Sequence, residues 1–160
     1  MAIKGARSGE GQITAHLLVR GGRKAIEFYT RAFGATVLYE SPMPGSSGLH
    51  AHLKVGRSMI MITDERPPSS DGMMSGIAAP ESLGATTTIL ECYVDDVDGA
   101  VQRAVDAGAK PLLPPCDAFY GDRFGWVVDP FGHVWSLATV KEELTPEEVH
   151  ERMTAAFRQS

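Results

Sequence analysis

Hydrophobic and polar residues follow two different periods along this chain. Arg23–Phe33 and Val97–Ala107 place apolar residues at helical spacing, and a glycine follows each stretch, as is common where helices end. The stretches around them alternate between apolar and polar residues and are separated by turns that contain glycine or proline, which is typical of strands. We predict strands over Gln12–Val19, Ala35–Ser41, Leu49–Val55, Ser58–Thr63, Thr86–Val94, Lys110–Pro114, Asp122–Asp129 and His133–Thr139.

The predicted elements occur twice in the same β-α-β-β-β order. An offset of 75 residues places Val19 on Val94 and His16 on Glu91. Internal similarity of this kind indicates two copies of one unit, neither of which is large enough to bury its own hydrophobic face. The expected organisation is a flexible tail at 1–11, one domain at 12–140 with a first module (12–63), a linker (64–85) and a second module (86–140), and a helical tail at 141–160.

The helical tail is expected to begin after Thr145. Thr145 is followed by Pro146 and, three positions after Thr145, by Glu148, which together are a helix-start signal. Apolar residues at Val149, Met153 and Phe157 then form a stripe along one side of this helix.

Composition narrows the class of protein. The net charge of −5 argues against a surface that neutralises phosphates, so we expect no nucleic-acid partner. Cys92 and Cys116 form neither a disulfide framework nor a zinc spacing. The chain has no apolar run of the roughly 20 residues that a bilayer span needs, and its first residues lack the apolar core of a signal peptide. These features predict a cytoplasmic protein that handles small molecules, with no membrane partner.

Strand alternation assigns side chains to two faces of each predicted sheet. The sides expected to face the helices are apolar, for example Leu17 and Val19 in the first module. The opposite sides mix polar and apolar residues, as expected of a pocket lining. They carry Thr14, His16, Leu18, Met59, Met61, Thr63, Ile89, Glu91, Tyr93, Val134, Ser136 and Ala138.

Three segments, AIEFYTRAFGA, YVDDVDGAVQRAVDAGA and FYGDRFGWVVDPFGHVWSLAT, carry a family resemblance. With the paired β-α-β-β-β units, they resemble the vicinal oxygen chelate superfamily of glyoxalase I, bleomycin-resistance proteins and extradiol dioxygenases. YGDR followed by DPFGH is similar to its PhnB-like branch. The resemblance spans about residues 12–140. It implies an α+β fold in which two βαβββ modules form a cup-shaped mixed sheet, and it implies a homodimer.

The resemblance also says where a metal would be held. In metal enzymes of the superfamily, ligands come from the first and fourth strands of each module. Carried over residue by residue, these positions are Thr14, Met61, Ile89 and Ser136. Such side chains do not suit a divalent cation, which prefers imidazole or carboxylate ligands. We therefore expect the usual metal site to be lost and no cofactor to be bound.

A shifted metal site is the alternative. His16 and Glu91 lie two residues after the expected first-strand positions, on the same faces. With a third ligand from His50, His52 or elsewhere, they would form a site for Zn, Ni, Mn or Fe. In the other interpretation, His16 and Glu91 hydrogen-bond each other or a ligand. In both cases the two residues could act as a base and its orienting partner.

The segment around Tyr120 and Arg123 has two interpretations. Arg123 could hold an anionic or carbonyl group while Tyr120 donates a hydrogen bond. Alternatively, Asp122 and Arg123 pair with each other and fix the loop. Cys92 is expected to be a small core residue and Cys116 an exposed loop thiol.

Two functions stay open at this point. The first is a metal-independent protein that binds a metabolite or drug-like ligand. The second is a metal-dependent lyase, isomerase or dioxygenase at the shifted site, in which the metal would polarise two adjacent oxygens while a carboxylate moves a proton. The candidate ligand-binding residues are Thr14, His16, His52, Met61, Glu91, Tyr93, Tyr120, Arg123 and Ser136.

Overall fold

The computed structural model describes residues 13–66 and 77–158 of the chain. They divide into two compact units. Of the described residues, unit 1 comprises 13–66, 77–87 and 130–133, and unit 2 comprises 88–129 and 134–158. The turn at 130–133 therefore belongs to unit 1. The predicted tail at 1–11 lies outside the described residues.

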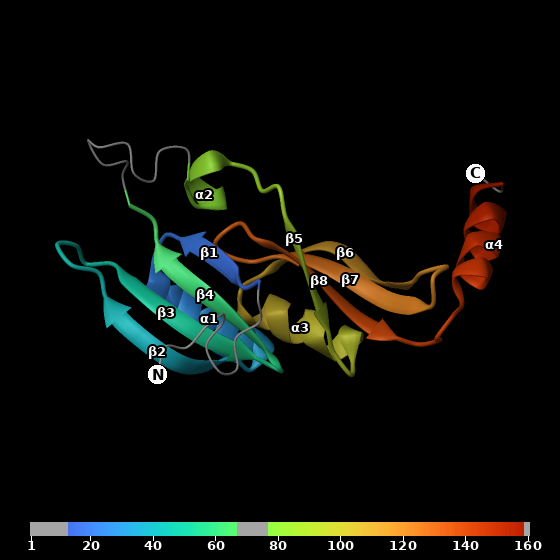
Figure 1. Ribbon diagram of the computed structural model, residues 1–160, viewed down its shortest axis with the longest axis horizontal. Coiled ribbons are helices and arrows are strands. Elements are labelled where there is room, and N and C mark those ends of the chain that lie inside the picture. The colour runs from blue at the N-terminus through green and yellow to red at the C-terminus, as the bar shows by residue number, and fades with distance from the viewer. Residues whose placement is uncertain (1–12, 67–76, 159–160) are drawn as a thin grey trace, which may run out of the picture. The chain divides into compact units, whose positions relative to one another are not determined.

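Unit 1 is a four-stranded sheet with one helix on it (Figure 1). The strand order is β1-β4-β3-β2, with β1 parallel to β4 and the other pairs antiparallel. The long helix α1 packs against β3 and β4. The elements are β1 (Ala15–Val19), α1 (Gly22–Phe33), β2 (Thr36–Pro42), β3 (Leu49–Val55), β4 (Ser58–Asp64) and the short helix α2 (Pro80–Leu83).

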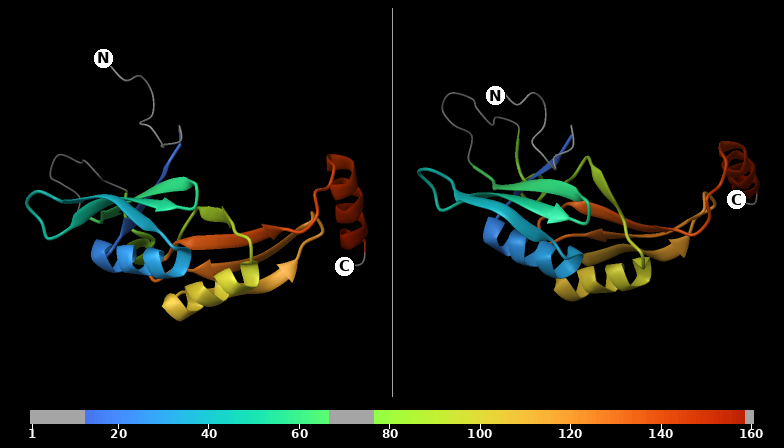
Figure 2. Two further views of the ribbon diagram at one scale, coloured as in Figure 1. Left: turned by 90° about the horizontal axis from the view of Figure 1, so that it is seen from below. Right: turned by 60° about the horizontal axis from the view of Figure 1, so that its bottom comes forward.

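Unit 2 repeats this arrangement. Its strand order is β5-β8-β7-β6, again with one parallel pair, and α3 packs on β6, β7 and β8. Figure 2 shows each sheet with its helix on one face. The elements are β5 (Ile89–Tyr93), α3 (Val97–Ala107), β6 (Lys110–Asp117), β7 (Asp122–Val128), β8 (Val134–Val140) and α4 (Pro146–Phe157). The α+β fold of two βαβββ modules is confirmed.

The core of unit 1 lies between α1 and its sheet. Ala25, Phe28, Tyr29 and Ala32 recur at helical spacing and are buried, so one side of α1 is apolar. The helix ends at Gly34, whose φ of 63° is a left-handed conformation that glycine adopts without strain. The sheet contributes the buried side chains Leu17, Val19, Ala51, Leu53, Ile60 and Ile62.

The core of unit 2 is built in the same way. Ala100, Val101 and Ala104 of α3 are buried, as are Val127 and Leu137 of the sheet. Within this unit the buried indole of Trp135 donates a hydrogen bond from Nε1 to Asp129 Oδ2 at 3.0 Å. Trp135 is therefore a packing residue of this core.

The sixth predicted strand is longer than expected. It was predicted to end at Pro114 but continues to Asp117, so Cys116 is a half-buried strand residue and not an exposed loop thiol. Prolines normally interrupt a sheet because they lack an amide hydrogen, but an edge strand with bulges tolerates them. β6 is such an edge strand, and its register shifts on both sides of Leu113.

The other boundary errors are small. The first strand begins at Ala15 and not at Gln12, and the fifth spans Ile89–Tyr93 and not Thr86–Val94. Part of the predicted linker is ordered, because Asp64 is the last residue of β4 and α2 follows at Pro80–Leu83.

Helix α4 starts as predicted. The Thr145 hydroxyl accepts a hydrogen bond from the Glu148 amide, and the Glu148 carboxylate accepts one from the Thr145 amide, which is the reciprocal capping box. None of its described residues is buried, and Phe157 is 71% exposed. Within the described ranges, no helix is both long and apolar enough to cross a membrane.

Candidate functional site

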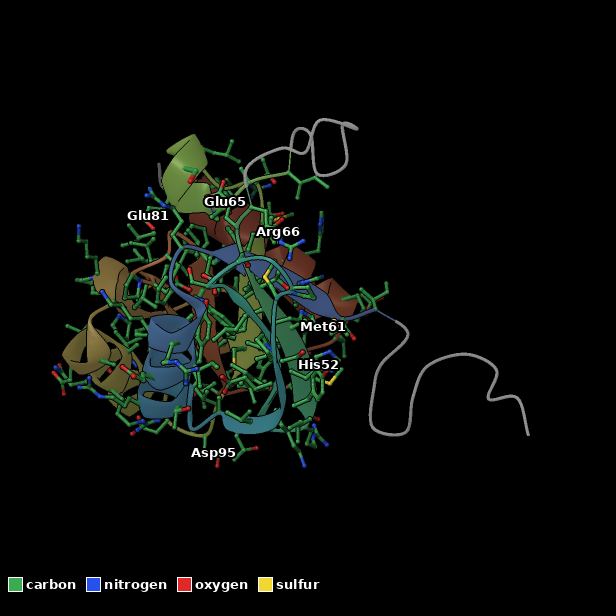
Figure 3. The ribbon with its side chains drawn as sticks, turned by 90° about the vertical axis from the view of Figure 1, so that its left-hand side faces the viewer. His52, Met61, Glu65, Arg66, Glu81 and Asp95 are labelled. Carbon is green, nitrogen blue, oxygen red and sulfur yellow. The ribbon has the colours of Figure 1, made fainter. Side chains whose placement is uncertain are left out.

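The sheet of unit 1 brings a set of polar side chains onto the face opposite α1. Strand register places His52 beside both Tyr39 and Met61, and Met61 beside His16. The neighbouring row places His50 beside Thr63. His52 and Met61 can be followed on adjacent strands in Figure 3. We call this surface the histidine face and define it by His16, Tyr39, His50, His52, Met61 and Thr63.

Three hydrogen bonds link four of these side chains into one chain. His16 Nε2 lies 2.7 Å from Thr63 Oγ1, and His50 Nδ1 lies 2.6 Å from the same oxygen. His50 Nε2 then lies 2.9 Å from His52 Nε2. We call the four residues the histidine chain. It crosses from β1 over β4 to β3, so residues 47 positions apart are joined.

Burial changes along the histidine chain. His16 is exposed, His50 is half-buried and His52 is only 8% exposed. The pKa of His16 is lowered from its ordinary value by burial of part of the ring and by repulsion from His52. The pKa of His50 is lowered by burial and by repulsion from the other two imidazoles. Near neutral pH, His16 and His50 are therefore neutral, and each offers one N–H donor and one accepting nitrogen.

Tyr39 gives the histidine face an aromatic border. Its ring lies edge-on to His52, with centroids 5.6 Å apart, and to His50, with centroids 6.5 Å apart. The side chain is 53% exposed. Together with the half-buried Met61, it provides apolar surface beside the polar chain.

The equivalent face of unit 2 has different chemistry. Register places Glu91 beside Ser136, and Ser136 beside Trp126. The Tyr93 hydroxyl donates to Asp122 Oδ2 at 3.2 Å, and burial together with the Asp122 charge raises the pKa of Tyr93. Glu91 and Tyr93 are exposed, whereas Ser136 is buried.

Arg123 is held by carboxylates other than the one predicted. Its Nε and Nη2 donate to the two oxygens of Asp98 at 2.7 and 2.8 Å, and Nη1 donates to Asp117 at 3.0 Å. Asp122 accepts from Tyr93, so the Asp122–Arg123 pair of the second interpretation is not formed. The Arg123 hydrogen bonds lower the pKa of Asp98. The sequence did not indicate these partners, because Asp98 lies in the first turn of α3 and Arg123 in β7, and the fold brings them together.

The remaining predicted residues are placed as follows. Thr14 precedes β1 and is half-buried. Tyr120 is 39% exposed, and its ring contacts those of Phe119 and Phe124. His16 belongs to unit 1 and Glu91 to unit 2, so their pairing stays a prediction.

The sequence did not single out Thr63 or Tyr39 as site residues, and it named His50 only as a possible third ligand. The alternation of β3 does place His50 and His52 on one face. The link through Thr63 depends on strand register, which period-two alternation alone leaves open.

The residues that the resemblance assigns to metal positions have side chains that suit a metal ion poorly. Thr14, Met61, Ile89 and Ser136 offer two hydroxyls, a thioether and a hydrocarbon. Among residues 13–66 and 77–158, no group of three or more His, Cys, Asp or Glu side chains is arranged to hold a metal. Register places His16 beside Met61 and Glu91 beside Ser136. Each candidate ligand of the shifted metal site therefore lies next to the residue on the fourth strand of its own module.

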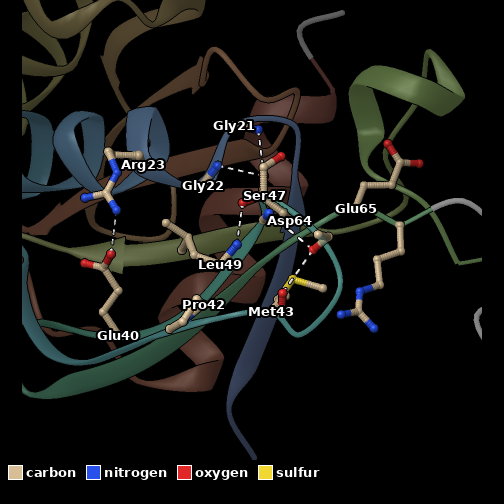
Figure 4. Close-up of a pocket in the computed structure, with 13 residues that line it drawn as sticks. Gly21, Gly22, Arg23, Glu40, Pro42, Met43, Ser47, Leu49, Asp64 and Glu65 are labelled. Atoms are coloured by element: carbon tan, nitrogen blue, oxygen red, sulfur yellow. Dashed lines mark hydrogen bonds and ion pairs between the residues drawn. The ribbon is translucent and has the colours of Figure 1, made fainter.

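A separate pocket lies where α1 begins, with a volume of about 620 Å³ (Figure 4). Asp64 organises it, because Oδ1 accepts from the Gly21 and Gly22 amides and Oδ2 accepts from the Leu49 amide. Arg23 pairs with Glu40 at 3.0 Å across the same pocket. Backbone amides satisfy Asp64, and Arg23 and Glu40 satisfy each other, so these contacts support the turn between β1 and α1.

Comparison with known proteins adds the following findings. The model of the Glyoxalase/Bleomycin resistance protein/Dioxygenase superfamily matches residues 11–137. The uncharacterized protein Rv0887c of Mycobacterium tuberculosis is 36% identical over 146 residues, which cover 91% of this chain and 84% of that protein.

Solved structures give the same picture of the fold. The At5g48480 gene product of Arabidopsis thaliana superposes with a TM-score of 0.59 at 25% identity, covering 80% of this chain and 98% of that one. The fosfomycin resistance protein FosX of Listeria monocytogenes superposes with a TM-score of 0.61 at 18% identity, covering 87% and 97%. The second likeness concerns the fold alone.

Proposed function

The chain belongs to the Glyoxalase/Bleomycin resistance protein/Dioxygenase superfamily, and we propose that it is a small-molecule binding protein which holds its ligand on the histidine face. The observation that carries this proposal is the histidine chain, in which three strands supply four linked polar side chains. Polar groups arranged on a sheet face beside Tyr39 and Met61 resemble the lining of a ligand site, where a few polar groups set orientation within apolar surface.

The proposed ligand is a metabolite or drug-like molecule with an aromatic or other apolar part. Tyr39 and Met61 would contact this part, and the exposed imidazole of His16 would hydrogen-bond a polar group. We also propose roles for residues of unit 2. The candidate ligand contacts in unit 2 are Glu91, Tyr93, Tyr120 and Ser136, and Thr14 and His52 are further candidates on unit 1. Arg123, held by Asp98 and Asp117, would position this part of β7.

Calorimetric titration of the full chain with a panel of substituted phenols and naphthols, in the presence of EDTA, tests this proposal. Wild-type protein is expected to bind members of the panel, and His16→Ala to weaken binding about tenfold, as loss of a ligand hydrogen bond and its ring contact would do. His150→Ala is the matched control, because His150 is an exposed histidine of α4. Binding that is unchanged in His16→Ala would contradict the assigned site.

A metal-dependent enzyme is the second candidate. The observation in its favour is that His16 and Glu91 each adjoin a fourth-strand position at which the family places a ligand. Elemental analysis, followed by calorimetry with Zn²⁺, Ni²⁺, Mn²⁺ and Fe²⁺, separates the two candidates. One metal ion per chain that is lost in both His16→Ala and Glu91→Ala would establish the metal site and overturn the binding-protein proposal. If wild-type protein takes up none of these ions, the metalloenzyme is excluded.

The assignment to a PhnB-like branch and the homodimer are further proposals. The first rests on the YGDR and DPFGH segments, and the second on the family. Light scattering on a sizing column tests the homodimer, since a mass equal to that of one chain at micromolar concentration would contradict it.

A further inference from the structure

The histidine chain can be ordered in two directions. A neutral imidazole has one N–H and one accepting nitrogen, and a hydroxyl has a single hydrogen. If His50 Nε2 donates to His52, then His50 Nδ1 must accept from the Thr63 hydroxyl. Thr63 Oγ1 in turn accepts from His16 Nε2. In this outward-accepting order, Nδ1 of His16 is an acceptor at the end of the chain.

The reverse order uses the same three contacts. His52 Nε2 donates to His50 Nε2, His50 Nδ1 donates to Thr63 Oγ1, and the Thr63 hydroxyl donates to His16 Nε2. Nδ1 of His16 then carries the hydrogen. In this outward-donating order, the exposed end of the chain is a donor.

The two orders present either an acceptor or a donor at His16 Nδ1. A ligand hydroxyl needs the acceptor, and its oxyanion needs the donor. We propose that the histidine face binds a weakly acidic hydroxyl, a phenol or an enol, at His16 Nδ1, and that the histidine chain reorders to hydrogen-bond both the hydroxyl and its oxyanion. This inference rests on the proposed function, since it specifies the ligand group that the same face recognises. Thr63, His50 and His52 are positioning residues in this scheme, because they act through His16.

Every proton that moves in this scheme belongs to the ligand or to the histidine chain. The neutral ligand donates its O–H to His16 Nδ1 in the outward-accepting order. On ionisation the O–H bond breaks, an N–H bond forms at Nδ1 and the electron pair stays on the ligand oxygen. The added proton either stays on His16 or passes through Thr63 and His50 to His52, and in each case an N–H of His16 faces the oxyanion. No other reactant is required.

The surroundings of the chain fit this use. His16 is the exposed end and can meet a ligand, while His52 is the buried end. Among the described residues, register places Tyr39 of β2 and Met61 of β4 beside His52. The lowered pKa values of His16 and His50 favour neutral rings before a ligand arrives, and a neutral ring has one N–H and one accepting nitrogen.

The matched probes are p-nitrophenol and p-nitroanisole, which share a ring but differ in the ionisable hydroxyl. Binding of p-nitrophenol is followed by its absorbance, which separates phenol from phenolate, and binding of p-nitroanisole by equilibrium dialysis. We expect wild-type protein to prefer p-nitrophenol, and Thr63→Val to reduce that preference about tenfold, as loss of one hydrogen bond in the chain would do. Thr63→Ser should restore it, and His150→Gln should leave it unchanged.

Nitrogen NMR of the imidazole rings reports which ring nitrogen carries the hydrogen. It therefore distinguishes proton ordering through Thr63 from a purely structural role of that residue. Binding of p-nitrophenol at His16 should change the tautomer balance of His50 in wild-type protein, although Thr63 separates the two rings. In Thr63→Val the His50 nitrogens should no longer respond.

Two results would overturn the inference, and they are distinguishable. Equal binding of both probes by wild type and Thr63→Val would overturn the proton-ordering chain while leaving the binding-protein function in place. Failure of wild-type protein to bind either probe or any member of the phenol panel would overturn the proposed function, and the inference with it.

Discussion

The two units begin their long helices in different ways, although they share one fold. The 75-residue offset matches Gly21 before α1 with Asp96 before α3. Asp96 caps its own helix, because its side chain accepts from the Gly99 amide at 3.1 Å. Gly21 has no side chain with which to cap, and Asp64 of β4 accepts instead from the amide of Gly21 and from that of Gly22, the first residue of α1.

A helix start has amide groups without partners and a partial positive charge, so both helices benefit from a carboxylate there. Unit 2 takes it from the adjacent residue, whereas unit 1 takes it from a strand 43 positions away. Asp64 also accepts from the Leu49 amide, so one carboxylate joins the helix start to β3 and β4. Both units therefore place a carboxylate at the start of the long helix, but residues at different positions of the repeat supply it.

The faces opposite the helices differ in a similar way. Unit 1 carries linked imidazoles, which can both donate and accept protons near neutral pH. Unit 2 carries exposed Glu91 and a Tyr93–Asp122 hydrogen bond. The proton-exchanging chemistry that we propose is therefore confined to unit 1.

The largest expected effect separates the two helix starts. Asp64→Ala removes the acceptor of three backbone amides and should lower the free energy of unfolding by about 3 kcal/mol, at about 1 kcal/mol per hydrogen bond. Asp96→Ala removes one such acceptor and should cost about 1 kcal/mol. Urea unfolding followed by circular dichroism measures both. Equal losses would show that the distant carboxylate is no more important than the local one.

The next effect concerns the hydroxyl of Tyr93. Tyr93→Phe leaves Asp122 without this donor and should lower the free energy of unfolding by about 0.5 to 1 kcal/mol. Tyr39→Phe on the histidine face is the matched control and should stay within about 0.5 kcal/mol of wild type. Thermal unfolding of the two variants gives the comparison, which fails if the control is the more damaging change.

A smaller effect is expected from Arg123→Lys. Lysine cannot make the two parallel bonds to Asp98, but the pair is solvent-exposed and contributes little to stability. We expect a lower melting temperature than wild type at low salt, a decrease smaller than that of Tyr93→Phe, and no difference at 1 M salt. A large decrease that persists in salt would indicate that Arg123 has a buried structural role.

The pH dependence should distinguish the units by the pH range in which each loses stability. The folded-state pKa values of His16 and His50 are lowered, so the unfolded chain binds protons first and stability falls as pH drops below about 6.5. The pKa of Asp98 is also lowered, but its contribution is lost only as pH falls below about 3.8. The free energy of unfolding, measured from pH 8 to pH 3, should fall near pH 6 in the wild-type protein. This decrease should be smaller in the double variant His16→Gln/His50→Gln. An undiminished loss near pH 6 in that variant would assign it to other groups.

Sequence alternation predicted most of the fold because each sheet has one apolar face. Leu17 and Val19, against His16 and Leu18, gave the faces of β1 correctly, and the position of Met61 on β4 followed in the same way. Strand ends were less accurate, because β6 continues through its prolines by shifting register.

The site was only partly predictable for a related reason. His16 was identified from its face and His52 from its place on the third predicted strand. The contact between Thr63 and two imidazoles depends instead on which residues lie in register across three strands. Asp64 was assigned to a linker, because a helix cap supplied from 43 residues away leaves no local pattern.

The cap supplied by Asp64 has a consequence for the order of folding. α3 can stabilise its first turn as soon as Asp96 and Gly99 are in place, three residues apart. The first turn of α1 gains its acceptor only after the chain has closed a loop of more than 40 residues and β4 has formed, which costs entropy before the contact is made. We therefore expect Asp64→Ala to act mainly by speeding unfolding, while Asp96→Ala also slows refolding. The first turns of α1 and α3, which occupy matching places in the repeat, would then form at different stages of folding.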